Sequence, residues 1–162
     1  KILQKLYKRL NFPNSYFVHR DYHSQNLMKV GNRVGVIDSQ DALIGNPTYD
    51  LVSLIDDVRL RTSKKLKKQI YDYYLNKINK IYRVNSQKFL DDFNVLSVQR
   101  SLKIIGIFSR LFKRDKKKEY LKFIPYIWQL LEIRMNSKIF LKLRKILNTN
   151  ISKKIRKKII SK

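Results

Sequence analysis

The chain has 162 residues, with 37 Lys or Arg against 12 Asp or Glu, which gives a formal charge of +25 at pH 7. A hydrophobic fraction of 43% argues against wholesale disorder. The absence of cysteine excludes disulfides, thiolate zinc sites and thiol nucleophiles. No apolar run approaches the roughly 18–20 residues of a membrane-spanning helix, and no signal-peptide pattern is visible. We therefore expect one cytoplasmic domain over residues 1–162, and the lysine at position 1 predicts that it belongs to a longer protein.

The charge is unevenly distributed along the chain. Residues 1–63 hold 9 basic and 6 acidic side chains, whereas residues 64–162 hold 28 basic and 6 acidic ones. Such an excess is typical of proteins that bind phosphate backbones or anionic lipid. However, 25 Lys, 19 Ile and 12 Asn, all with A/T-rich codons, also indicate a compositional bias that adds lysine to solvated helix faces. We favour the bias, so nucleic acid is not the expected partner.

The first third of the chain predicts a mixture of short elements. An apolar helical stripe within residues 2–10 ends at a loop around Pro13. A short strand follows at 16–18, and residues 27–30 and 33–37 flank Gly31-Asn32 as a β-hairpin. After a loop at 45–47, Asp50 is predicted to cap a helix that continues to residue 58.

The remainder of the chain predicts helices. Their expected ranges are 63–81, 85–108, a helix with Pro125 in its first turn, about 137–147 and about 151–160. Two pairs of carboxylates, Asp56-Asp57 and Asp91-Asp92, fall within helical patterns and are expected on solvated faces. The fold class is therefore mainly α with a small β-hairpin (α+β). Residues 16–50 form a loop-and-hairpin segment, and a helical bundle spans 50–162.

The polar stretch from His19 to Asn26, with Asp38 twelve residues later, carries the chemistry. Phosphoryl transfer from ATP needs an aligned acceptor hydroxyl and cations on the phosphates. One carboxylate, Asp21, can orient the hydroxyl and accept its proton. Asn26 and Asp38 offer the oxygen ligands that Mg²⁺ prefers. A loop between strands would bring the three together, so the sequence predicts a phosphotransferase that uses ATP and Mg²⁺.

These residues resemble the catalytic loop and metal-binding aspartate of the protein-kinase-like fold, and His23 points to the aminoglycoside phosphotransferase and choline kinase branch. Four blocks are similar to bacterial kinases that phosphorylate the anomeric hydroxyl of N-acetylmuramate and N-acetylglucosamine. The blocks span 17–28, 35–42, 47–54 and 99–110. The resemblance implies that the chain is the C-terminal lobe of such an enzyme, used in cell-wall sugar recycling.

The resemblance also implies a role for each matching residue. Asp21 would be the catalytic base, and Asn26 and Asp38 would hold Mg²⁺ on the ATP phosphates. His19 and Asp50 would support the loop. Candidate substrate-binding or orienting residues are His23, Asp41 and Arg100. Ser39 stands where the family often has Phe, which removes a packing contact but no metal ligand.

The N-terminal lobe of the fold is missing from this chain. Its four glycines, at 31, 35, 45 and 106, cannot form a glycine-rich phosphate loop, and no strand with the phosphate-binding Lys precedes residue 19. We therefore expect the missing lobe, from the same gene or a partner chain, to complete the ATP site, and this chain alone to be weakly active or inactive. The alternatives are a kinase of aminoglycosides or choline-type alcohols, and a non-catalytic kinase-like module whose basic helices bind nucleic acid or anionic lipid.

Overall fold

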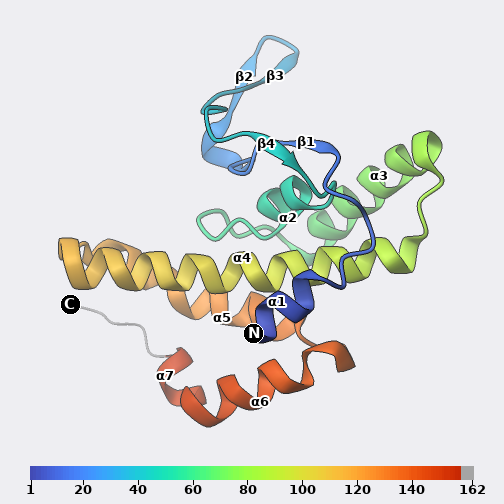
Figure 1. Ribbon diagram of the computed structural model, residues 1–162. Helices are drawn as coiled ribbons and strands as arrows, with labels where there is room; N and C mark the ends of the chain where they lie inside the picture. Colours follow the sequence, from blue (N-terminus) through green and yellow to red (C-terminus); the bar gives the residue numbers. More distant parts are fainter. Residues whose placement is uncertain (158–162) are drawn as a thin grey trace. The chain divides into compact units, whose positions relative to one another are not determined.

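The computed structural model describes residues 1–157 and divides into two compact units (Figure 1). Arg9–Leu96 form one unit, called the loop unit below. Lys1–Lys8 and the residues from Ser97 onward form the other, called the helical unit. The protein is mainly helical and contains the predicted β-hairpin; a second small antiparallel strand pair was not predicted. A single domain over 1–162 stays a prediction.

Two strand pairs frame the polar stretch of the loop unit. Strand β1 (Tyr16–Val18) pairs antiparallel with β4 (Leu43–Gly45), and β2 (Leu27–Val30) pairs with β3 (Arg33–Val36). Gly31 turns the second hairpin with a φ of 59°, a value that glycine adopts without steric cost. A 3₁₀ turn, η1 (Ser24–Asn26), leads directly into β2. The polar stretch therefore lies between β1 and the hairpin.

Helices α2 (Tyr49–Ile55) and α3 (Lys64–Tyr82), with the beginning of α4 (Ser86–Asp115), form the core of the loop unit. Figure 1 shows α2 and α3 beside each other. Tyr71 of α3 meets Phe93 edge-on, with 5.3 Å between the ring centroids. The fully buried members of this core include Val52, Phe89 and Phe93. The core therefore fixes α2, the helix that follows the polar stretch.

Two of the three predicted side-chain caps are present. The Ser63 hydroxyl accepts a hydrogen bond from the Leu66 amide at 3.1 Å, and Asn85 Oδ1 accepts one from the Lys88 amide at 3.0 Å. The predicted cap at Asp50 is wrong. Thr48 occupies the position before α2, and Asp50 lies within the first turn, where its carboxylate bonds to another segment.

The helical unit is built from α1 (Ile2–Tyr7), the rest of α4, η2 (Lys118–Phe123), α5 (Ile124–Arg134), η3 (Lys138–Phe140), α6 (Leu141–Asn150) and α7 (Lys153–Lys157). Arg156 of α7 is buried, donates to Glu132 Oε1 at 2.9 Å and lies 4.7 Å from the Trp128 ring centre. The helix predicted at 137–147 begins with the 3₁₀ turn η3, which leads into α6. The helix predicted at 151–160 is seen to residue 157, and its last three residues lie outside the described part of the chain. No helix within residues 1–157 is long and apolar enough to cross a membrane.

Candidate active site

The β2–β3 hairpin brings the two predicted metal ligands together. Its register pairs Leu27 with Val36, and the Ile37 amide donates to the Asn26 carbonyl at 3.1 Å, which extends the ladder by one residue. Asn26 at the start of the hairpin and Asp38 just after its end consequently become neighbours. A positive φ of 68° at Asp38 turns the chain out of the strand at this point.

The Asn26 side chain connects both aspartates of the predicted site. Its Nδ2 donates to the Asp21 carbonyl oxygen at 3.0 Å and lies 3.4 Å from Asp38 Oδ2. Both contacts use the amide nitrogen, so the Asn26 carbonyl oxygen is the atom that the predicted metal site would use as a ligand. The other carboxylate oxygen of Asp38 accepts from Gln40 Nε2 at 2.6 Å. This carboxylate–carboxamide set has the oxygen chemistry that Mg²⁺ prefers.

The segment before Asp21 is held by His19 and Asp50. The buried His19 ring places Nε2 3.0 Å from the Ile37 carbonyl oxygen. The two carboxylate oxygens of Asp50 accept the backbone amides of His19 and Arg20, at 2.7 and 2.9 Å. Arg20 adopts a φ of 72°, a strained value for a residue with a side chain. The Asp50 contacts stabilise this turn immediately before Asp21.

The local environment perturbs the Asp50 carboxyl group. Burial raises its pKa above the ordinary value, because removal from water disfavours the charged form. The hydrogen bonds from the backbone amides of His19 and Arg20 lower the pKa, but by less than burial raises it. Asp50 is therefore a half-buried acceptor for the loop backbone.

The structure places the three candidate substrate residues in different environments. His23 is buried at the start of the η1 turn, and its amide donates to the Asp21 carbonyl at 2.9 Å. Asp41 is exposed, and its carbonyl accepts from Arg20 Nη1 at 3.2 Å. Arg100 is only 8% exposed and belongs to the helical unit. Substrate binding by these residues remains a prediction.

The expectation that the paired carboxylates are solvated is wrong for three of the four. Asp56, Asp57 and Asp92 are each at most 3% exposed, while Asp91 is half-buried. Asp56 pairs with Lys67 at 3.3 Å. Asp57 and Asp92 accept hydrogen bonds from segments distant in sequence, and these bonds offset the cost of burying a charge. Helical periodicity alone did not reveal these distant donors.

Asp57 contacts the predicted catalytic loop at Ser24, a contact that the sequence reasoning did not predict. Ser24 is the first residue of the η1 turn, and its hydroxyl and amide both donate to Asp57 Oδ2, at 2.6 and 3.2 Å. The available signal was a carboxylate placed directly after a helix whose first turn carries Asp50.

Other clusters in the described residues are less suited to chemistry. Residues 1–157 contain no group of three His, Asp or Glu side chains able to hold a metal ion. Exposed lysines occur on α3, α4, α6 and α7; whether they reflect compositional bias or bind an anionic partner stays a prediction.

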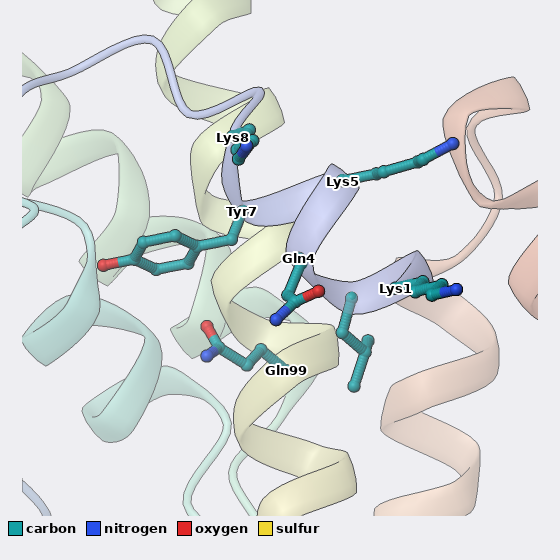
Figure 2. A pocket seen from close by; sticks show the side chains of 7 residues that line it. Lys1, Gln4, Lys5, Tyr7, Lys8 and Gln99 are labelled. Carbon is teal, nitrogen blue, oxygen red and sulfur yellow. The ribbon is translucent and has the colours of Figure 1, made fainter.

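A pocket of about 690 Å³ lies in the helical unit, between α1 and α4. Figure 2 shows Gln4 of α1 and Gln99 of α4 projecting toward it, with Lys1, Lys5 and Lys8 around it. None of the predicted site residues lines this pocket. It therefore does not coincide with the constellation around Asn26.

The model of the phosphotransferase enzyme family matches residues 2–83, which include the whole polar stretch and its hairpin. The chain belongs to this family. It is 36% identical over 122 residues to a protein of Caulobacter vibrioides named N-acetylmuramate/N-acetylglucosamine kinase, covering 72% of this chain and 33% of that protein. A protein of the same name from Neisseria meningitidis is 39% identical, over 67% of this chain and 34% of that protein. Another from Pseudomonas aeruginosa is 37% identical, over 72% of this chain and 35% of that protein. The chain spans about a third of the length of these relatives.

Proposed function

We propose that this chain is the catalytic C-terminal lobe of an ATP- and Mg²⁺-dependent kinase that phosphorylates the anomeric hydroxyl of N-acetylmuramate or N-acetylglucosamine. One observation carries the proposal: the side-chain amide nitrogen of Asn26 contacts both the Asp21 carbonyl oxygen and the Asp38 carboxylate. The relatives named as kinases of these two sugars supply the substrate class. A cytoplasmic location and a role in cell-wall sugar recycling follow from the same proposal.

In this mechanism Asp21 orients the sugar hydroxyl and accepts its proton as the oxygen attacks the terminal phosphate of ATP, and the bond from that phosphorus to the bridging oxygen breaks to release ADP. The half-buried Asp21 is held close to the metal-ligand pair through its own backbone, because its carbonyl accepts from Asn26 and from the His23 amide. Asn26 Oδ1 and the Asp38 carboxylate are the atoms that would hold Mg²⁺. When bound, Mg²⁺ neutralises charge on the phosphates.

The missing N-terminal lobe forms part of the same proposal. The four glycines of this chain do not provide a phosphate-covering loop, so the remaining ATP contacts come from sequence outside it. The chain also covers only about a third of its relatives. By itself it should bind ATP poorly and be weakly active or inactive.

The position of the transferred phosphate tests the proposal. The chain, together with any further sequence that its gene encodes, is incubated with ATP, Mg²⁺ and each amino sugar, and the product is analysed by ³¹P and ¹H NMR. We expect phosphate on the anomeric oxygen. The matched control is the 1,5-anhydro form of N-acetylglucosamine, which lacks only the anomeric hydroxyl and should not be phosphorylated. Phosphate on the 6-hydroxyl, or transfer to an aminoglycoside or choline instead, would contradict it.

A further inference from the structure

Helix α2 and the residues directly after it present three polar groups to the loop that contains Asp21. Asp50 accepts the amides of His19 and Arg20, as described above. Three residues later, the buried Ser53 hydroxyl lies 3.4 Å from the Arg20 carbonyl oxygen. Asp57 follows the end of the helix. The 50/53 spacing places Asp50 and Ser53 on one helix face, so this face contacts the loop before Asp21.

Asp57 contacts the same loop on the other side of Asp21. Its carboxylate is buried, and Oδ2 accepts both the hydroxyl and the amide of Ser24, at 2.6 and 3.2 Å. Its Oδ1 accepts the Arg59 amide at 2.9 Å. Burial on its own would raise the pKa of Asp57. The hydrogen bonds from Ser24 and Arg59, with the nearby His23, outweigh that effect and lower the pKa. The ionised carboxylate is thus well matched to its donors.

Ser24 is the first residue of the three-residue turn that ends at Asn26. The Asn26 amide closes this turn by donating to the His23 carbonyl at 2.9 Å. A displacement of Ser24 would therefore move Asn26 and the side-chain amide that connects Asp21 with Asp38. Asp57 contacts this turn at Ser24, which is the route by which it would act on these atoms.

We propose that Asp57 is a positioning residue that acts through Ser24 to hold Asn26 where it can bind a divalent cation. The loop around Asp21 is then fixed at both ends by one short segment of the chain, by Asp50 before the catalytic position and by Asp57, just after α2, on the other side. The consequence for catalysis depends on the function proposed above. The effect on the conformation of the loop does not.

Hydrogen exchange tests the conformational part without any assay of activity. Exchange of the Ser24 and Asn26 amides is followed by NMR or mass spectrometry in the full gene product and in Asp57→Asn. A hydrogen bond to a charged acceptor corresponds to a roughly ten- to hundred-fold effect on an equilibrium. Asn keeps an acceptor oxygen but loses the charge, so we expect exchange about five-fold or more faster in Asp57→Asn.

The matched control is Asp56→Asn. Asp56 is equally buried and adjacent in sequence, but its carboxylate pairs with Lys67 of α3. It should leave exchange at Ser24 and Asn26 within about two-fold of the wild type. Unchanged exchange in Asp57→Asn, or equal acceleration in both variants, would overturn the proposal.

The Mg²⁺ dependence of turnover tests the catalytic part. In Asp57→Asn the Mg²⁺ concentration for half-maximal rate should rise about ten-fold or more, while KM for the sugar changes by less than about two-fold. A variant that is only less stable would contain fewer active molecules, but neither the half-maximal Mg²⁺ concentration nor KM for the sugar would change. Equal changes in both parameters would contradict the proposal.

Ser24→Ala provides a second route if Asp57→Asn does not fold. It removes only the hydroxyl in the 2.6 Å contact and should reproduce the Mg²⁺ shift in part. The double variant should be no worse than Asp57→Asn alone, because both changes break one interaction. Fully additive effects would overturn the proposal. If the wild type phosphorylates neither sugar, the proposed function fails, but hydrogen exchange still decides whether Asp57 positions the turn.

Discussion

Asp92→Ala should strongly destabilise the loop unit. Asp92 is 1% exposed, and its carboxylate accepts the Asn11 and Phe12 amides at 2.8 and 3.0 Å. It also accepts the side-chain amides of Asn11 and Asn46 at 2.9 and 2.8 Å. These donors lie on the segment that leads into β1 and on the turn that follows β4. One carboxylate thus fixes both chain segments that frame the polar stretch.

The magnitude follows from these four bonds. Hydrogen bonds to a charged group contribute about 1.5–3 kcal/mol each, and a buried donor left without a partner costs about 1–3 kcal/mol. Only the Asn46 contact is fully buried, and water can replace the acceptor for the others. We therefore expect the free energy of unfolding to fall by about 3–5 kcal/mol. With a urea dependence of about 2 kcal/mol per molar, the midpoint should move down by about 2 M.

Urea unfolding followed by circular dichroism measures this effect, with Asp91→Ala as the matched control. Asp91 is the adjacent carboxylate on the same helix, half-buried and in contact with Gln87 at 3.0 Å. Its replacement should lower the free energy of unfolding by less than about 1 kcal/mol. If the two variants unfold within 1 kcal/mol of each other, the four-bond argument is refuted.

Three further predictions concern the core, the turn before Asp21 and the effect of pH. Phe93→Ala should lower the free energy of unfolding by about 3–5 kcal/mol in urea, because the side chain is fully buried; a loss below 1 kcal/mol would refute the assigned core. Arg20→Gly should be about 1 kcal/mol more stable than Arg20→Ala, because only glycine adopts the φ of 72° without strain; equal thermal midpoints would contradict this. The Asp57 pKa is lowered from the ordinary value of an aspartate, so its stabilisation is present above that ordinary value and is lost as pH falls through the lower, folded-state pKa. Stability measured against pH should therefore fall less steeply in acid for Asp57→Asn than for the wild type, and parallel curves would argue against this shift.

Local signals in the sequence predicted the hairpin and most helices. Gly31 between two apolar runs indicated the β2–β3 turn, and Ser63 and Asn85 marked the starts of α3 and α4. Strand β4 was not predicted, because its three residues gain their partners only from β1, more than twenty residues earlier. Pairing at that distance leaves no local pattern.

The surroundings of the candidate site were harder to predict than its members. The proximity of Asn26 to Asp38 follows from a hairpin register that the sequence specifies. The burial of Asp57 depends instead on a donor 33 residues away, and that of Asp92 on donors up to 81 residues away. An isolated carboxylate in a helical pattern is normally solvated. Tertiary hydrogen bonds reversed that preference here.

The central claim is that Asp21 acts as the base for phosphate transfer to an amino sugar. The most direct test is the rate of sugar-dependent ADP release by the full gene product with Asp21→Asn, at saturating ATP and Mg²⁺. The control is Asp72→Asn, a half-buried carboxylate on α3 that pairs with Lys68. We predict that the wild type and Asp72→Asn phosphorylate N-acetylmuramate or N-acetylglucosamine at similar rates, and that Asp21→Asn retains less than about one hundredth of that rate while folding normally. Robust activity in Asp21→Asn would contradict the mechanism.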